Sequence, residues 1–592
     1  MIQRTIGGPA RLLFALTLLA LSAQAVPAQS TDWLQAPAEA ADYQDRGTLY
    51  QPLMEFVYEL ESRTELMNVM KLTETLGGRD VVLAVLSNPP VFQPGDLANS
   101  DKPIVLIVNN VHGGEVAGKD AAMEIMRDLV MGDLRPLLDE VVVLVIPTIN
   151  PDGAEIYRRT NDEGFDMNRD YIKLETQEIQ SLVTDVINKW HPHIHLDTHH
   201  GGSAPYTLTY QGNMNPAGDP NIMAFGDEEI LPRVREALRA EDYEGFWYSG
   251  PRTVDGVEGW GPTSVEPRKQ HVYSTLANMV GFLYETPSGA HRVVDNGTRV
   301  VPVPEEERYR HQVRGEYIGQ RELIRFAAER GDELVAVVAK ARADAIARGN
   351  DDSDDDLIPL AYEQVERFKA DFWRPAEGSE SRGEDVEYEL VNGPVFTRWV
   401  PTVTATRPWG YLIPNSLTKV VPLLLDHGIT VKQLTEDVEL EVEAWQATEI
   451  TNDEYFQAHY LKDVKAQKET KTLTMPAGSF FIPSGQPMSN FISYIFEPTT
   501  NDNLVTWGYL DNVLRVTPSQ EEIAEQVAEM EERLAGLSEE DRANYGPRIE
   551  RQIQNLTSPQ EIPMYRVMKK TDIPGVLVER FNKYERNRYI RY

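Results

Sequence analysis

The order of hydrophobic and polar positions predicts strands that alternate with helices up to about residue 350. Short apolar runs, which are typical of buried strands, alternate with stretches that carry apolar residues at helical spacing. We expect strands at 81–86, 104–108, 141–146, 193–199 and 279–284, and helices at 52–67, 118–131, 177–189, 224–240 and 304–348. This alternation favours an α/β fold, in which a mixed, mostly parallel central sheet has helices on both faces.

The pattern changes beyond an acidic run that ends near residue 356. Short alternating segments at 386–391 and 439–445 predict strands, and Ser519 begins a helix with a capping-box pattern. That helix and its neighbour are charged on nearly all sides, which predicts an exposed helical hairpin. A chain of 592 residues is too long for one core. We expect a larger domain at 50–345, a linker at 346–356 and a smaller α+β C-terminal domain at 357–592.

Two further segments have a recognisable composition. Residues 211–270 are rich in glycine, proline and charge, which predicts long loops around the helix at 224–240. At the N-terminus, two arginines, an apolar segment at 12–21 and Ala23-Gln24-Ala25 have the pattern of a secretory signal. We therefore expect a signal peptide at 1–25, a loose leader at 26–49, and a secreted or periplasmic protein.

Charge and cysteine content narrow the possible partners. The formal net charge is −36, which disfavours nucleic acid and anionic membranes because neither would be attracted to the protein. The apolar segment near the N-terminus is too short to span a bilayer, and we expect no membrane span after signal removal. Cysteine is absent, so a bound metal would be held by histidines and carboxylates.

Polar, glycine-rich loops follow several predicted strands, and ligands bind at the carboxyl ends of strands in open α/β sheets. His112 and Glu115 form an H-x-x-E pair after the strand at 104–108, and His199 ends the strand at 193–199. Two histidines, a carboxylate and one open position are a common catalytic zinc site. His195 and His200 compete for the third position, although His195 lies deeper in its strand and His200 faces the other way.

Further polar residues surround this predicted metal site. The segment from Arg158 to Arg169 supplies hydrogen-bond donors, and an arginine beside the amide of Asn168 suits recognition of a free carboxylate. A second arginine could stabilise an oxyanion. Glu285 ends an apolar strand, where partial burial can tune the pKa of a carboxyl group.

Taken in order, these residues resemble the zinc metallocarboxypeptidase family, the carboxypeptidase A/B-like enzymes, over roughly residues 50–330. The similar motifs are His112-Gly113-Gly114-Glu115, Asn150-Pro151-Asp152-Gly153, Arg159-Thr160-Asn161, Asp166-Met167-Asn168-Arg169, Asp197-Thr198-His199 and Glu285. The resemblance implies one Zn²⁺ per catalytic domain, with His112, Glu115 and His199 as its ligands. It also implies that Asp166 orients the first histidine and that Glu285 is the general base. Arg159 would stabilise the oxyanion, and Asn168 and Arg169 would bind the substrate carboxylate.

The resemblance leaves other positions open. The family's substrate-capping tyrosine has Tyr273 as its candidate here, with Tyr248 as a weaker one. The part beyond residue 357 resembles the accessory region of some secreted bacterial members. We expect a zinc-dependent carboxypeptidase that acts on peptides. The alternatives are an amidohydrolase of the same fold, which would act on N-acyl amino acids or cell-wall peptides, and a catalytically silent binding protein.

Overall fold

The computed structural model describes residues 33–40 and 47–578, apart from 263–264, 352, 354, 381–382 and 384. The predicted signal peptide at 1–25 lies outside the described residues, as does part of the predicted leader. Within the described residues, no helix combines the length and the apolar character that crossing a membrane requires.

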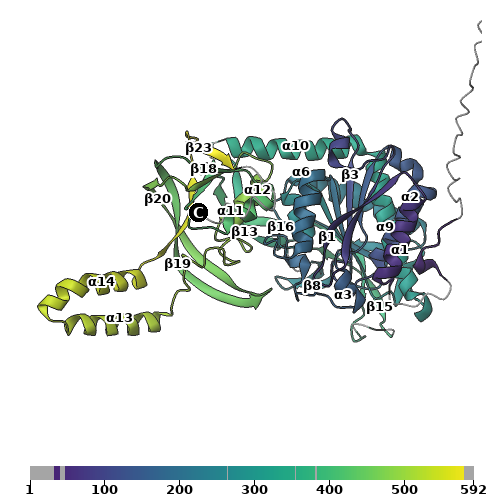
Figure 1. The fold of residues 1–592 in the computed structure, drawn as a ribbon. Coiled ribbons are helices and arrows are strands. Elements are labelled where there is room, and N and C mark those ends of the chain that lie inside the picture. Colours follow the sequence, from purple (N-terminus) through teal and green to yellow (C-terminus); the bar gives the residue numbers. More distant parts are fainter. Residues whose placement is uncertain are drawn as a thin grey trace, which may run out of the picture. The chain divides into compact units, whose positions relative to one another are not determined.

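A mixed central sheet organises the N-terminal half (Figure 1). Among the described residues it has eight strands in the order β1-β2-β4-β3-β5-β10-β6-β7. Their bounds are β1 Met67–Glu74, β2 Asp80–Leu86, β3 Ile104–Asn109, β4 Val142–Ile146, β5 Ile194–His200, β6 Leu208–Gly212, β7 Gly245–Trp247 and β10 Val280–Thr286. The four central strands β4, β3, β5 and β10 run parallel to one another, while β1, β2 and β6 introduce antiparallel pairs. The predicted mixed, mostly parallel sheet is confirmed.

Helices cover both faces of this sheet because the apolar residues of its strands alternate in direction. Val105 and Ile107 of β3 pack into one core, and Leu106 and Val108 pack into another. Each such side chain contributes about 1.5–3 kcal/mol when it leaves water. The first core includes α1 (Tyr50–Ser62), α2 (Ala117–Met131), α7 (Leu231–Ala240), α9 (Arg308–Glu329) and α10 (Gly331–Asn350). The second includes α4 (Gln177–Ser181), a π-helical turn at Leu182–Ile187, α5 (Asn188–Trp190) and α8 (Gln270–Leu276).

The region at 211–270 is more regular than its composition predicts. It contains β8 (Gly250–Val254) and β9 (Val257–Gly261), which join β14 (Phe368–Pro375) and β15 (Tyr388–Val395) in a separate sheet. The expectation of long loops was therefore wrong for this part. β8 and β9 contain glycine and polar residues rather than an apolar run, and they pair with each other as a hairpin. Trp260 of β9 also pairs with Val395 of the distant β15.

A second large sheet lies in the C-terminal half. Seven of its strands are described, in the order β20-β19-β22-β17-β21-β18-β23. Their bounds are β17 Gly410–Ile413, β18 Val431–Leu434, β19 Val438–Phe456, β20 His459–Met475, β21 Phe480–Pro483, β22 Gln560–Val567 and β23 Gly575–Val578. β19 and β20 form a long two-stranded ribbon, of which the predicted strand at 439–445 covers only the first part (Figure 1). The helices α11 (Val420–Asp426) and α12 (Ser489–Phe496) pack in this half.

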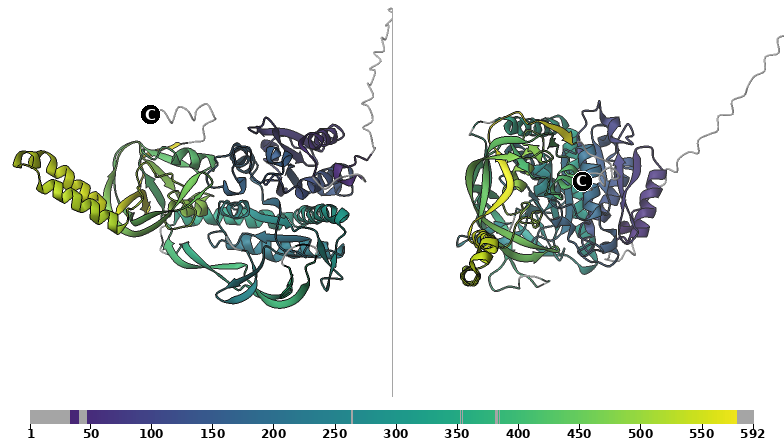
Figure 2. Two further views of the ribbon diagram at one scale, coloured as in Figure 1. Left: turned by 90° about the horizontal axis from the view of Figure 1, so that it is seen from below. Right: turned by 60° about the vertical axis from the view of Figure 1, so that its left-hand side comes forward.

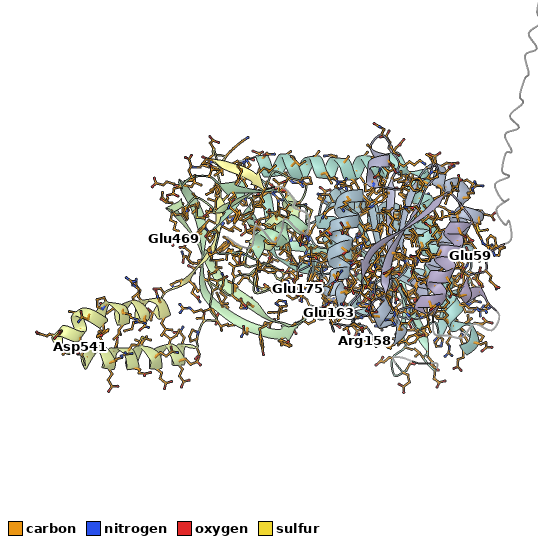
Figure 3. All side chains as sticks on the ribbon, viewed as in Figure 1. Glu59, Arg158, Glu163, Glu175, Glu469 and Asp541 are labelled. Carbon is orange, nitrogen blue, oxygen red and sulfur yellow. The ribbon has the colours of Figure 1, made fainter. Side chains whose placement is uncertain are left out.

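The predicted helical hairpin is present as α13 (Gln520–Ala535) and α14 (Glu539–Thr557), which lie side by side (Figures 1 and 2). Ser519 and Glu522 form the predicted capping box. No residue of α13 is buried in the described chain, and the exposed Asp541, labelled in Figure 3, lies in the first turn of α14. Charged side chains around both helices explain why solvent surrounds them.

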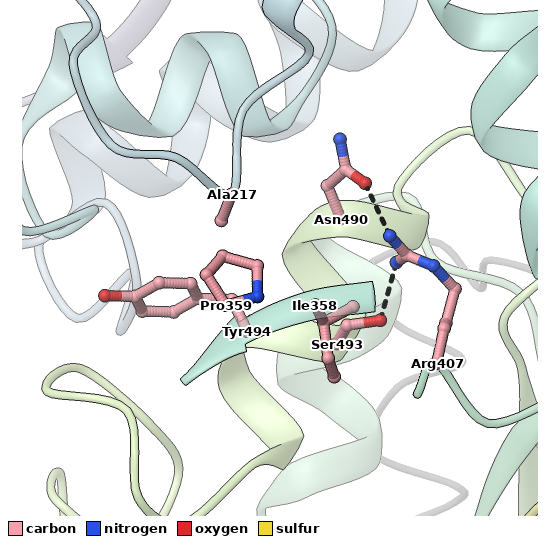
Figure 4. Close-up of a pocket in the computed structure, with 7 residues that line it drawn as sticks. All are labelled: Ala217, Ile358, Pro359, Arg407, Asn490, Ser493 and Tyr494. Atoms are coloured by element: carbon pink, nitrogen blue, oxygen red, sulfur yellow. Dashed lines mark hydrogen bonds between the residues drawn. The ribbon is translucent and has the colours of Figure 1, made fainter. Parts of the chain in front are cut away.

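Contacts cross the predicted domain boundary, because β9 pairs with β15 and the backbone N–H of Arg268 donates to Asp502. Arg407, which follows β16 (Arg398–Thr406), is buried and donates hydrogen bonds to Asp356, Ser493 and Asn490 beside a small pocket (Figure 4). β16 itself pairs with β13 (Leu357–Val365). The described residues from Leu34 onward form one compact unit, and the division into two domains stays a prediction.

Candidate metal centre and active site

Parallel strands bring the predicted site residues to one edge of the central sheet. The loop after β3 carries His112 and Glu115, while His199 and Glu285 lie at the carboxyl ends of β5 and β10. The rings of His112 and His199 have their centroids 4.8 Å apart. Residues more than eighty positions apart in sequence therefore meet at this sheet edge.

Three side-chain atoms converge as metal ligands would. Oε2 of Glu115 lies 2.9 Å from Nδ1 of His112 and 2.9 Å from Nδ1 of His199. The two Nδ1 atoms are 3.1 Å apart. Two imidazole nitrogens and one carboxylate oxygen form a donor set that zinc prefers, and bonds of about 2 Å to one ion require such mutual spacings. The three residues fit a zinc ion.

The opposite nitrogen of each histidine is held by an aspartate. Nε2 of His112 lies 3.0 Å from Oδ1 of Asp166, and Nε2 of His199 lies 2.9 Å from Oδ2 of Asp197. A carboxylate that accepts the Nε2 proton leaves the Nδ1 lone pair for a metal. Burial raises the pKa of Asp166, but the hydrogen bond and charge of His112 outweigh it and lower that pKa below its ordinary value.

The ligand loop depends on Asn110, which the sequence analysis did not single out. Its φ of +60° lies in the left-handed region, which asparagine tolerates better than most residues. Its amide Nδ2 donates to the carbonyl oxygens of His112 at 2.8 Å and Glu115 at 2.9 Å. Gly113 is required beside it, because a Cβ there would lie 2.1 Å from the backbone of Gly153. The Asn150–Gly153 turn therefore packs directly against the ligand loop.

Glu285 lies beside the three converging atoms. It pairs with His199 in the register of β10 and β5, and it is 8% exposed. Burial, together with the charge of Glu115, raises the pKa of Glu285 to about 7. A Cβ on Gly201 would lie 2.4 Å from Oε2 of Glu285, so that glycine leaves the space that the carboxylate occupies.

The predicted substrate residues have different surroundings. Arg159 has 49% of its side chain exposed, and it donates to Oδ2 of Asp166 at 2.9 Å and to Oε1 of Glu115 at 3.2 Å. Arg169 is half-buried and ends the short 3-10 turn Met167–Arg169, which follows Asp166. Asn168 is buried: its Oδ1 accepts the N–H of Gln270, and its Nδ2 lies 3.2 Å from Nε2 of His199. In this structure the amide of Asn168 packs against a predicted ligand.

Tyr273 does not lie at the site, and the structure corrects this prediction. It belongs to α8, all of whose residues are buried, and its hydroxyl lies 3.0 Å from Nδ1 of His427. Its ring packs against Phe491. Tyr248, between β7 and β8, lies near the site instead: the charge of Glu285, then burial, raises the pKa of its phenol.

The two competing histidines have structural partners. Nδ1 of His195 lies 2.9 Å from Oγ of Ser274, and burial lowers the pKa of His195 to about 3. Nε2 of His200 accepts the N–H of Ala117 at the start of α2, on the other side of the sheet. Neither side chain joins the group of converging ligand atoms.

Comparison with known proteins agrees with this arrangement. Residues 53–225 match the family model described as zinc carboxypeptidase. Carboxypeptidase 2 of Trichophyton tonsurans is 22% identical over 435 residues, which cover 70% of this chain and 75% of that protein. Human carboxypeptidase D is 25% identical over 214 residues, which cover 33% of this chain and 15% of that protein. The family match and these relatives confirm the predicted enzyme class, a hydrolase of the metallocarboxypeptidase type.

Solved structures were also matched. Carboxypeptidase A from Helicoverpa armigera has a TM-score of 0.37 and 15% identity, covering 50% of this chain and 78% of that one. A metallo-carboxypeptidase from Pseudomonas aeruginosa, solved with (2-guanidinoethylmercapto)succinic acid, has a TM-score of 0.36 and 19% identity, covering 49% and 70%. The predicted secreted bacterial type stays a prediction, since Trichophyton, the source of the first relative, is a fungus.

Proposed function

We propose that the protein is a zinc carboxypeptidase that releases the C-terminal residue of peptides. The observation that carries this proposal is the convergence of Nδ1 of His112, Oε2 of Glu115 and Nδ1 of His199 within about 3 Å of one another. These three residues would hold one Zn²⁺. The ion, when bound, supplies a Lewis acid and lowers the pKa of water toward neutrality.

Glu285 would act as the general base. Its raised pKa lies close to neutral pH, where a carboxylate can both accept a proton from water and return it to the leaving amine. Its place opposite His199 puts it beside the ligands without making it one of them. Gly201 preserves the space around its carboxylate.

Cationic and phenolic groups would bind the substrate. Arg159 is exposed enough to donate to the oxyanion that forms at the cleaved carbonyl. Arg169 is our candidate for the terminal carboxylate, because a guanidinium can bind both carboxylate oxygens. Asn168, whose amide contacts His199 and Gln270, would share this task only after a change of partner. Tyr248, rather than Tyr273, would contact the bound peptide from the β7–β8 connection.

A substrate panel tests this function. The purified chain would be assayed with blocked dipeptides that vary in the C-terminal residue, and with matched C-terminal amides, before and after chelation and zinc restoration. Zinc-dependent release of the last residue from free acids alone supports the proposal. Cleavage of amides at equal rates overturns the carboxylate-binding role, and activity confined to N-acyl amino acids favours the amidohydrolase alternative.

We also infer a secreted or periplasmic location. The support is the secretory-signal pattern at residues 1–25. The N-terminal sequence of the protein isolated from its native source tests this, because cleavage after Ala25 is the expected result. Recovery of the protein only from the cytoplasm, with Met1 retained, would contradict it.

A further inference from the structure

The segment at 165–175, which carries three of the predicted site residues, is held by residues from the C-terminal half. Oε1 of Gln457 accepts the backbone N–H of Asp166 at 2.9 Å. Nε2 of His459 lies 2.9 Å from Oε1 of Glu175, and the hydroxyl of Tyr509 donates to the carbonyl oxygen of Lys173 at 3.2 Å. Figure 3 labels Glu175 on the side of the N-terminal half that faces the β19–β20 ribbon.

Gln457 occupies an unfavourable turn. It joins β19 to β20 together with Ala458, and their φ angles are +50° and +62°. A two-residue turn with both residues in the left-handed region favours Asn-Gly, because other residues meet steric repulsion there. Backbone strain of this kind persists where the surroundings require the conformation, and it is common at functional sites. Gln-Ala is a costly choice for the turn alone, whereas the Gln457 side chain has a specific partner.

The turn is also firmly docked. Phe456 and His459, the last pair of the ribbon before the turn, both contact the ring of Trp507. The guanidinium of Arg268 lies 5.3 Å from the ring centroid of Phe456 and 5.2 Å from that of Trp507. Arg268 also accepts the N–H of Tyr171 through its carbonyl oxygen. Aromatic and cation–π contacts therefore fix the ribbon end against the same 165–175 segment.

We propose that Gln457 is a positioning residue of the metal site. By accepting the N–H of Asp166, it holds the residue whose carboxylate contacts both Nε2 of His112 and Nε of Arg159. The ribbon, which lies outside the residues matched by the family model, would thereby complete the catalytic half. This inference rests on the proposed function, because it requires a metal at His112.

Two substitutions of Gln457 and one matched control separate positioning from folding. Gln457→Ala removes the acceptor, but it also leaves alanine at a positive φ. Gln457→Asn suits the left-handed turn better, and its side chain is one methylene shorter, which withdraws the oxygen from Asp166. Ala458→Gly is the matched control, because it relieves the same turn and leaves the Gln457 side chain in place.

The test measures zinc dissociation into excess chelator, kcat, KM and Tm for the full chain and each variant. We expect zinc to leave Gln457→Asn about ten times faster, as for residues that support a ligand from behind, with a lower kcat and a Tm at or above wild type. Ala458→Gly should keep the wild-type dissociation rate and kcat. Wild-type dissociation and kcat in Gln457→Asn would overturn the inference alone. A wild-type chain that binds no zinc would overturn the proposed function, and this inference with it.

Discussion

Glu285 and His199 face each other across two neighbouring parallel strands, β10 and β5. This register gives a buried carboxylate a fixed place beside a predicted metal ligand, while the ligand itself is oriented by Asp197. Because both residues belong to the rigid sheet and not to loops, their relative position is set by backbone hydrogen bonds. The arrangement makes the roles of the two side chains separable by mutation.

Replacing Glu285 with glutamine should abolish proton transfer and leave the metal in place. The amide keeps the shape of the side chain but cannot act as a base, so kcat should fall by about 10²–10⁴. Zinc content, measured by elemental analysis, should match wild type. Glu163→Gln, at an exposed glutamate, is the control. Near-normal kcat in Glu285→Gln would remove this residue from the mechanism.

Replacing Asp197 with asparagine should weaken metal binding. The substitution removes the negative partner of Nε2 of His199 and lowers the basicity of the ring. We expect zinc affinity, measured by chelator competition, to fall about 10–100-fold. The exposed Asp101→Asn serves as the comparison. Unchanged affinity would mean that Asp197 does not support a ligand.

Replacing Gly201 with alanine should displace the carboxylate of Glu285. The added Cβ would lie 2.4 Å from Oε2, and the flexible end of that side chain can move without shifting the sheet. We expect Tm and zinc content close to wild type and a kcat lower by up to about 10²-fold, since catalysis is sensitive to misplacement near 1 Å. Gly95→Ala, with open space around its Cβ, should keep full activity. Full activity in Gly201→Ala would show that this contact is unimportant.

Replacing each of the two candidate tyrosines with phenylalanine should affect a different property, catalysis for Tyr248 and stability for Tyr273. Tyr248→Phe should raise KM or lower kcat while leaving Tm unchanged, because the charge of Glu285 acts on its phenol and its side chain is only partly buried. Tyr273→Phe should lower stability by about 1 kcal/mol and keep the kinetic constants, since it loses a buried hydrogen bond to His427. Urea unfolding and steady-state kinetics on both variants give the comparison. A kinetic effect limited to Tyr273→Phe would restore the prediction made from the sequence.

Glu178 should make stability depend on pH. It is buried in α4 with Oε2 lacking a partner, and burial raises its pKa from 4.5 to about 7. The folded protein therefore binds this proton more tightly than the unfolded chain, so stability falls as pH rises from about 4.5 to 7. Glu178→Gln should be more stable than wild type by roughly 1–3 kcal/mol above pH 7 and equal to it below pH 4.5. Exposed Glu65→Gln should leave the pH profile of unfolding unchanged.

Local patterns predicted the framework of the site well. His112 and Glu115 are three residues apart after a strand, and His199 ends another, so strand direction alone brings them to one edge. The apolar runs of β3, β4, β5 and β10 are recognisable without tertiary information, because each strand is buried on both faces. Motif spacing and apolar runs can be read directly from a sequence.

Other features depend on contacts that no local pattern encodes. Tyr273 is the tyrosine that the sequence favours, but it lies in the buried helix α8. Its hydroxyl contacts His427, a residue 154 positions away. Asn110 holds the ligand loop because its backbone is left-handed and its amide donates to three carbonyl oxygens. The full length of β19 and β20 escaped prediction because the outer parts of this ribbon are polar and exposed.

The hydrogen bond from Asp166 to Gln457 spans 291 positions of the chain, which has a consequence for biosynthesis. A ribosome that adds roughly 5–20 residues per second needs about 15–60 s to travel that distance. Throughout this interval the nascent polypeptide already contains His112, Glu115 and Asp166 but not yet Gln457. Peptide-cleaving activity would thus mature late, after nearly the whole polypeptide has been made.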